Sequence, residues 1–175
     1  LAGKVAMVTG GARHLGHDMA DAFAEAGANV VITSRNLARA ERAAEILAAA
    51  HGGDVLPLQL DVREYAQVEE AARTAQAWKG QIDVLVNNAG GGAGQGSTDL
   101  FERQPEEIVD MIHTNLIGAL YCCKEVGRIM AGQGSGKIIN IASIAALVGR
   151  DRLMYERSGL AGQGVDYAAA KAGLL

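Results

Sequence analysis

Two side chains near the end of this 175-residue chain carry the clearest chemical signal. Tyr167 and Lys171 are four positions apart in the stretch Tyr-Ala-Ala-Ala-Lys, and on a helix this spacing places both side chains on one face. A free phenol has a pKa of about 10, and a nearby ammonium group favours the phenolate. The pair is therefore suited to proton transfer near neutral pH. On its own the spacing is more typical of an ordinary amphipathic helix, so the interpretation depends on other motifs.

A glycine-rich segment near the start of the chain could hold a phosphate. Residues 9–16 read Thr-Gly-Gly-Ala-Arg-His-Leu-Gly, between a short apolar run and a helix pattern. Glycines let the backbone approach a phosphate closely, and the free N–H groups at a helix N-terminus bind it. The position of the segment favours a dinucleotide site over an ordinary turn.

The elements that must position these groups alternate along the chain. Apolar runs typical of strands are separated by helix patterns; we expect strands at 4–9, 29–33, 55–60, 82–86 and 137–142, and helices at 15–26, 37–51, 64–78, 105–130 and from 167 onward. Right-handed crossovers then give a doubly wound parallel α/β sheet of strand order 3-2-1-4-5 in a single domain. Pro57 indicates that the third strand lies at an edge. Ligands of such sheets bind at the carboxyl ends of strands. Residues 148–166 show neither a strand nor a helix pattern and are predicted to be polar and irregular.

The residues after the second strand bear on which nucleotide is bound. NAD-binding sheets commonly carry an acid there for the ribose 2′-hydroxyl, but this chain reads Thr33-Ser34-Arg35-Asn36. Arg35 could instead bind a 2′-phosphate, and a further arginine, Arg13, lies in the glycine turn. The pattern favours NADP(H) over NAD(H); the alternative is that both arginines are solvated surface charges.

Composition excludes several other classes of function. The net charge is −4, and no basic face for nucleic acid is evident. No apolar run approaches the ~18 residues of a membrane span, and the first residues lead directly into a strand, which argues against a signal peptide. Cys122 and Cys123 are adjacent, so neither a mutual disulfide nor a metal site is expected. We expect a cytoplasmic protein without a metal.

Taken in order, these motifs resemble those of the short-chain dehydrogenases/reductases over essentially the whole chain, which implies a Rossmann-like fold. The family's Thr-Gly-x-x-x-Gly-x-Gly motif falls on residues 9–16, with His14 at the middle glycine. Histidine tolerates left-handed backbone better than most residues. Arg13 stands where NADP-preferring members often carry a second basic residue, which implies a second cation for the 2′-phosphate. Residues 61–62 resemble the family's adenine-contacting pair, although Asp61 could simply be a helix N-cap. Residues 87–90 form its Asn-Asn-Ala-Gly motif, whose amides could also tie strand ends together. The cofactor residues so implied are Gly10, Arg13, His14, Leu15, Gly16, Arg35, Asn36, Asp61, Val62, Asn87, Ala89 and Gly90.

The resemblance also implies catalytic roles for Asn115, Ser143, Tyr167 and Lys171. Tyr167 would donate a proton to a carbonyl oxygen that Ser143 orients, while Lys171 binds the ribose and tunes Tyr167. Asn115 would hold a water in the proton relay. Ser143 could otherwise be a capping serine, and an asparagine inside an apolar helix stripe is unfavourable unless it is paired.

Two features depart from the family pattern. Ser143 and Tyr167 are 24 positions apart, about twice the family's common spacing. The extra segment carries Arg150, Asp151, Arg152, Tyr155, Glu156 and Arg157. It could form a polar loop that favours a polar or anionic substrate such as a sugar acid, or be a surface insertion without a substrate role. The chain also stops four residues after Lys171, where family members continue, so we expect an incomplete domain with the fifth strand as an exposed edge.

The function that this resemblance implies is NADP(H)-dependent, reversible hydride transfer between a nicotinamide and a ketone or secondary alcohol. Candidate activities are those of a 3-oxoacyl-thioester reductase and of a sugar or gluconate dehydrogenase. The alternatives are a non-catalytic NADP-binding sensor or an inactive fragment, and a purely structural domain would leave the motifs unexplained. The helix at 106–130 could pair with its copy in a homodimer or homotetramer.

Overall fold

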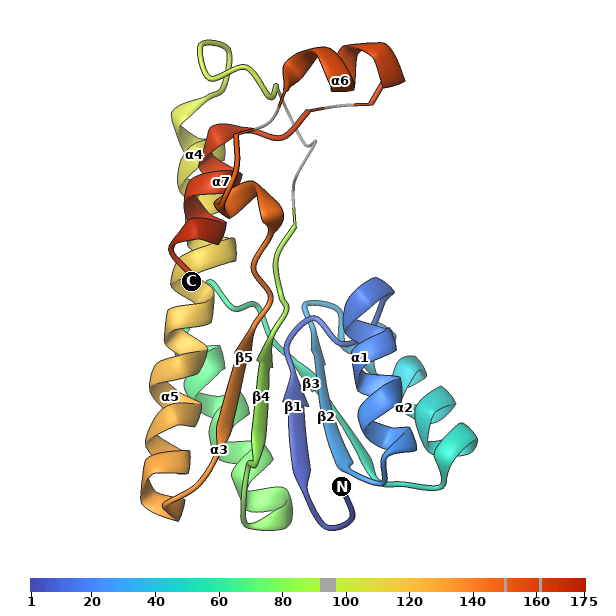
Figure 1. Cartoon of the computed structure of the whole chain (residues 1–175). Coiled ribbons are helices and arrows are strands. Elements are labelled where there is room, and N and C mark those ends of the chain that lie inside the picture. The colour runs from blue at the N-terminus through green and yellow to red at the C-terminus, as the bar shows by residue number, and fades with distance from the viewer. Residues whose placement is uncertain (92–96, 150, 161) are drawn as a thin grey trace. The chain divides into compact units, whose positions relative to one another are not determined.

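The computed structural model describes residues 1–91, 97–149, 151–160 and 162–175 (Figure 1). It divides into two compact units. The sheet unit comprises Leu1–Ala89 and Gly118–Asn140, and the helical unit comprises Gly90–Ile117 and Ile141–Leu175.

The sheet unit is built on five parallel strands in the order β3-β2-β1-β4-β5, which confirms the predicted topology. The strands are β1 Val5–Val8, β2 Asn29–Ser34, β3 Val55–Gln59, β4 Val84–Asn87 and β5 Lys137–Asn140. β3 lies at one edge, as Pro57 predicted. β5 forms the other edge, and its residues Ile138 and Ile139 are exposed.

Four helices cover this sheet: α1 His14–Glu25, α2 Leu37–His51, α3 Tyr65–Lys79 and α5 Gly118–Gln133. Figure 1 shows α1 and α2 on one side of the sheet and α3 and α5 on the other. Gly52 and Gly80 end α2 and α3 in the left-handed conformation, which glycine adopts without steric penalty.

The core of the sheet unit lies between the central strands and the pair α3 and α5. Met7 of β1, Val31 of β2 and Leu85 of β4 pack there with Val68 of α3 and Val126 of α5. The helices present many small residues, and short side chains let a helix lie close to a sheet. The alternate strand residues are buried as well, as expected for a parallel sheet with helices on both faces.

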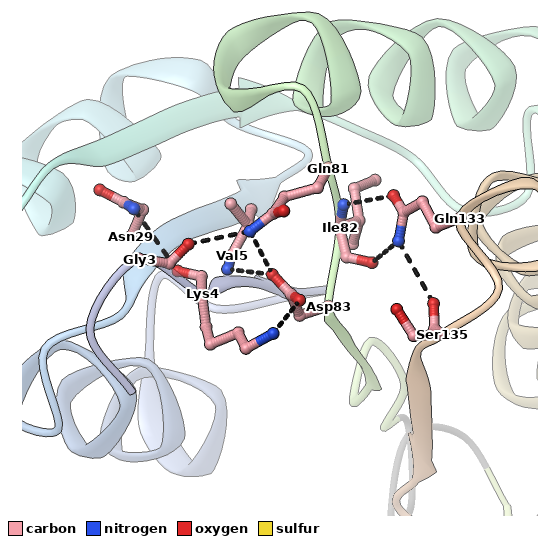
Figure 2. Close-up of polar contacts among 9 residues, drawn as sticks. All are labelled: Gly3, Lys4, Val5, Asn29, Gln81, Ile82, Asp83, Gln133 and Ser135. Atoms are coloured by element: carbon pink, nitrogen blue, oxygen red, sulfur yellow. Dashed lines mark hydrogen bonds and ion pairs between the residues drawn. The ribbon is translucent and has the colours of Figure 1, made fainter.

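Side chains tie the amino ends of β1 and β4 together (Figure 2). The Asp83 carboxylate accepts hydrogen bonds from Lys4 Nζ and from Val5 N, each at 2.8 Å. Gln81 Nε2 donates to Gly3 O and to Asp83 Oδ2, each at 2.9 Å. One carboxylate and one amide from the residues just before β4 therefore hold the start of β1.

A second amide extends this network to α5. Gln133 Oε1 accepts from Ile82 N at 2.9 Å, and Gln133 Nε2 donates to Ile82 O at 3.0 Å (Figure 2). The side chain of Gln133 thus pairs with the backbone of Ile82 as a strand neighbour would. The end of α5 is fixed beside the start of β4.

The helical unit contains α4 Pro105–Ile112, the π-helical turn η1 His113–Ile117, the 3-10 turn η2 Ile144–Ala146, α6 Arg152–Ser158 and α7 Val165–Ala172. α7 packs against η2, α4 and η1. The helix predicted for 105–130 is therefore interrupted by a π-helical turn, which the unbroken apolar stripe did not reveal. The expectation that 148–166 is irregular was wrong in part, because Asp151 caps a short helix there. Within the described residues, no helix combines the length and apolar character needed to cross a membrane.

Candidate functional site

The predicted phosphate-binding turn connects β1 to α1 in the sheet unit. A Cβ built on Gly16 would lie 2.3 Å from Gly10 O and 2.5 Å from Asn88 Nδ2, so only glycine fits where α1 begins. Gly10 itself has a φ of +65°. Leu15, in the first turn of α1, is exposed. The Gly10 carbonyl and the Asn88 amide therefore close the inner side of the turn, and a side chain larger than that of glycine would not fit at position 16.

His14 has an unusual backbone conformation in this turn, and Arg13 leaves the N-terminus of α1 without a side-chain cap. His14 has a φ of +50° and is the one described non-glycine residue with positive φ, as expected at a position where the family pattern has glycine. Arg13 is the N-cap of α1 but makes no side-chain capping hydrogen bond. The first N–H groups of α1 therefore keep their affinity for an anion, and both side chains are exposed beside them. These features fit a nucleotide phosphate.

Arg35 and Asn36 lie where β2 ends. Asn36 Oδ1 accepts from Arg39 N at 2.9 Å and so caps α2, which is a structural role. The side chain of Arg35 is exposed, while its carbonyl accepts from Gln59 Nε2 at 3.2 Å. Asn36 thus sets the start of α2, and the Arg35 side chain extends into solvent.

Asp61 follows β3 and is held by an arginine that the sequence analysis did not single out. Arg63 donates to the Asp61 carboxylate through Nε at 3.1 Å and Nη2 at 2.8 Å, and through its backbone N at 3.1 Å. These hydrogen bonds outweigh burial and lower the pKa of Asp61, and the charge of Arg35 acts in the same direction. The alternative reading of Asp61 as a helix N-cap is wrong, because Glu64 occupies that position of α3. Val62 is buried against Gly118.

The Asn-Asn-Ala-Gly motif joins neighbouring strand ends. Asn88 Nδ2 donates to Thr9 O at 2.9 Å, and Thr9 Oγ1 accepts from Asn88 N at 3.0 Å and from Ala89 N at 2.9 Å. Asn87 Nδ2 donates to Asn140 Oδ1 at 2.9 Å. β4 is therefore tied to β1 by one asparagine and to β5 by the other, as anticipated for these amides.

Asn115 lies in the π-helical turn of the helical unit and is buried. Its Oδ1 accepts from Gly91 N at 2.9 Å, and its Nδ2 donates to Gly91 O at 3.1 Å and to Met111 O at 3.1 Å. A Cβ on Gly90 would lie 2.5 Å from Asn115 Oδ1, so the loop passes close to the amide. The predicted need for pairing is met, and π-helical turns often mark functional sites.

Lys171 and Tyr167 lie on one side of α7, as predicted. Lys171 Nζ donates to Ile141 O at 2.7 Å and lies 5.8 Å from the centroid of the Tyr167 ring. The Lys171 side chain is buried, and burial lowers its pKa. Tyr167 is half-buried. A buried ammonium therefore stands near the phenol ring.

Ser143 caps η2, which packs against α7. Its Oγ accepts from Ala145 N at 3.2 Å, so the capping interpretation is confirmed. The hydroxyl proton is not used by that bond and can be donated elsewhere. Asn115, Ser143, Tyr167 and Lys171 all belong to the helical unit.

A buried ion pair in the helical unit escaped the sequence analysis. Arg103 Nε donates to Asp166 Oδ2 at 2.5 Å, and the two side chains are 5% and 1% exposed. Asp166 directly precedes Tyr167, and the 63 positions between Arg103 and Asp166 leave no local spacing that could reveal the pair.

The extra segment between Ser143 and Tyr167 is less polar at its surface than predicted. Leu153, Met154 and Leu160 are 54%, 68% and 66% exposed. Tyr155 is half-buried, and its carbonyl accepts from Ser158 Oγ. Arg150 and the side chain of Arg152 lie outside the described part of the chain. Within that part, no three His, Cys, Asp or Glu side chains gather as a metal site.

The match to the short chain dehydrogenase family covers residues 4–175, so the chain belongs to that family. It is 36% identical to a 3-oxoacyl-[acyl-carrier-protein] reductase of Synechocystis sp. over 100% of this chain and 65% of the relative. It is 34% identical to the 3-oxoacyl-[acyl-carrier-protein] reductase FabG of Escherichia coli over 99% of this chain and 64% of the relative. The chain therefore spans less than two thirds of the length of these curated relatives.

Solved structures agree with this assignment. A metagenomic short-chain oxidoreductase in complex with NADP superposes with a TM-score of 0.85 at 31% identity, covering 99% of this chain and 72% of that chain. At this identity and TM-score, the family and the Rossmann-like fold are both established.

Proposed function

We propose that this chain provides the cofactor site and the proton-transfer residues of an NADP(H)-dependent oxidoreductase. The reaction would be reversible hydride transfer between the nicotinamide and a ketone or secondary alcohol. The observation that carries the proposal is the buried Lys171 ammonium near the Tyr167 ring, in a chain that also has the glycine turn of this family. A non-catalytic sensor would have no need of the Tyr167 phenol beside that ammonium.

The cofactor would be held by the turn between β1 and α1. Gly10 and Gly16 leave backbone space for the pyrophosphate, and the N-terminus of α1 supplies N–H donors. The exposed Arg35 would bind the 2′-phosphate, with Arg13 as its second cation. When bound, the nicotinamide supplies or accepts the hydride.

Asp61 and the Asn-Asn-Ala-Gly stretch would complete the cofactor contacts. Asp61 would accept from the adenine amine, while Arg63 holds the carboxylate ionised. Ala89 and Gly90 are small, so the chain after β4 can run close to the cofactor. Asn87 would act indirectly, through its bond to Asn140.

In the reducing direction Tyr167 would donate its proton to the carbonyl oxygen as hydride reaches the carbonyl carbon. Lys171 would favour the resulting phenolate, because a cation nearby stabilises negative charge on oxygen. Ser143 would donate its hydroxyl proton to the same substrate oxygen and so orient it. Asn115 would keep the loop at Gly91 in place beside the relay.

The substrate class best supported is a 3-oxoacyl group carried as a thioester. Both relatives compared above bear the name 3-oxoacyl-[acyl-carrier-protein] reductase. The exposed apolar side chains of Leu153 and Met154 suit an acyl chain better than a sugar acid. Asp151, Glu156 and Arg157 would be the residues that favour a polar substrate instead. We also propose assembly as a homodimer or homotetramer, in which α5, with its exposed Leu120, would pair with its copy.

A turnover assay with Tyr167→Phe tests the catalytic part of this proposal. The substitution should lower the rate of NADPH oxidation with a 3-oxoacyl thioester by about 10²–10⁴-fold, since it removes the proton donor. The affinity for NADPH should stay unchanged, because the cofactor turn belongs to the sheet unit. Tyr155→Phe is the matched control and should turn over normally. Equal turnover by the Tyr167→Phe variant and the parent chain would refute the assignment.

A further inference from the structure

The buried ion pair between Arg103 and Asp166 sits at the start of the helix that carries Tyr167. Asp166 is in the first turn of α7, whose N-cap is Gly164. Its carboxylate accepts from Arg103 Nε through Oδ2 at 2.5 Å and from Tyr167 N through Oδ1 at 2.9 Å. The same carboxylate therefore binds an arginine from another segment and the backbone of Tyr167.

The surroundings of this carboxylate leave it little freedom. A Cβ built on Gly164 would lie 2.2 Å from Asp166 Oδ1, so the backbone at Gly164 closes one side of the carboxylate. Arg103 Nη1 donates to Ser97 O at 3.0 Å, which anchors the guanidinium to a second segment. Because both side chains are more than nine-tenths buried, neither charge can be satisfied by solvent.

We infer that Arg103 and Asp166 are a positioning pair that holds Tyr167 in place for proton transfer, a role that rests on the function proposed above. Neither residue touches the reacting atoms. Removing the arginine leaves an uncompensated buried carboxylate, which is strongly unfavourable. The start of α7 must then shift to relieve it, and Tyr167 shifts with its backbone N–H. A misplacement of about 1 Å can lower a rate by ~100-fold.

Paired substitutions separate positioning from general stability. Arg103→Gln alone should lower kcat by about 10- to 100-fold, with the KM for NADPH changed by less than about threefold. Adding Asp166→Asn gives an uncharged pair in which the Asn carbonyl can still accept from Tyr167 N while the Asn amide donates to the Gln carbonyl. That double variant should recover kcat to within about threefold of the parent chain. Arg128→Gln is the matched control, because Arg128 pairs with the buried carboxylate of Glu125 in the sheet unit; it should leave kcat unchanged.

A spectroscopic measurement tests the inference without relying on activity. Fluorotyrosine can be incorporated at all four tyrosines, and the fluorine resonance of Tyr167 is assigned with Tyr167→Phe. Arg103→Gln should move that resonance and leave those of Tyr65, Tyr121 and Tyr155 in place. The double variant should return it, and Arg128→Gln should not move it.

The outcomes discriminate between the two proposals. A Tyr167 resonance that stays in place in folded Arg103→Gln, or a double variant that fails to restore it, overturns the positioning role. An unchanged kcat in Arg103→Gln does the same if the parent chain turns over. A parent chain without turnover, but with the expected resonance shifts, counts against the proposed function and supports the placement of Tyr167 by this pair.

Discussion

The two ends of the parallel sheet differ in the turns and helix ends that lie beside them. At the amino ends of β1 and β4, polar side chains pair with backbone and with each other: Asp83 binds Lys4 and Val5, and Gln133 binds Ile82 (Figure 2). At the carboxyl ends, side chains also join the strands, through Asn88 with Thr9 and Asn87 with Asn140, but the turn after β1 depends on glycines, because a Cβ on Gly16 would meet Gly10 O.

The carboxyl end of the sheet also has backbone features that are unfavourable for stability. His14 adopts a left-handed conformation, and the N-cap of α1 makes no side-chain capping bond. Backbone strain and unused donors of this kind gather where a ligand binds. This difference supports the proposal that the amino end of the sheet serves stability and the carboxyl end binds the cofactor. Substitutions at one end, with the other end as reference, test it.

The largest effect is expected from Gly16→Ala at the carboxyl end. The added methyl would meet Gly10 O at 2.3 Å, so either α1 or the turn must move. We expect the affinity for NADPH to fall by about 10- to 100-fold and the free energy of unfolding by ~1–3 kcal/mol, the usual range for overpacking. Cofactor titration and denaturant unfolding measure the two effects.

Gly132→Ala is the matched control for that variant. Gly132 lies in α5 and has open space around its Cα. Alanine is favoured over glycine inside a helix by up to about 1 kcal/mol, so this control should be slightly stabilised and bind NADPH normally. Normal NADPH binding by Gly16→Ala would mean that the tight turn is not part of the cofactor site.

A smaller effect is expected from Asp83→Ala at the amino end, because this substitution should change stability but not NADPH binding. The substitution leaves Val5 N and Lys4 Nζ without their acceptor. We expect the free energy of unfolding to fall by ~1–3 kcal/mol, while the folded protein binds NADPH as before. Asp54→Ala, which removes an exposed ion pair with Lys79, should change stability by less than about 0.5 kcal/mol. Weaker NADPH binding in folded Asp83→Ala would break the division of roles between the two ends.

The smallest effect is a pH dependence at the end of β3. Arg63 lowers the pKa of Asp61 from its ordinary value of 3.8. Because the folded value is the lower one, ionised Asp61 contributes stability above the ordinary pKa, and this contribution is lost as the pH falls through the folded value. Arg63→Gln should therefore lose less stability than the parent chain on acidification below about pH 4. Unfolding curves across this range measure the difference, with the exposed Arg73→Gln as control; identical acid dependence in both variants would argue against the Asp61–Arg63 coupling.

Much of the fold could be predicted because its signals are local. The alternation of strand and helix patterns predicted the strand order, and Pro57 predicted that β3 lies at an edge. The spacing of four between Tyr167 and Lys171 predicted that both lie on one face of a helix. Long-range pairs could not be predicted in this way. Arg103 meets Asp166 only because α7 packs against α4, and nothing near either residue marks the contact.

Local sequence patterns were also insufficient where the same pattern is compatible with two kinds of secondary structure. The apolar stripe of residues 105–130 continues through the π-helical turn at Asn115, because one extra residue per turn barely alters it. The segment after Ser143 is rich in charge, yet Asp151 and Gly159 cap a helix that the charges concealed.

Fluorescence titration of the purified chain with NADPH and NADH, repeated on Arg35→Gln, tests the central claim most directly. One charged hydrogen bond to the 2′-phosphate contributes ~1.5–3 kcal/mol, so NADPH should bind about 10- to 100-fold more tightly than NADH. Arg35→Gln should remove most of that difference by weakening NADPH alone. Equal or tighter binding of NADH by the parent chain, or binding of neither by folded protein, would contradict the account of the carboxyl end of this sheet as an NADP(H) site.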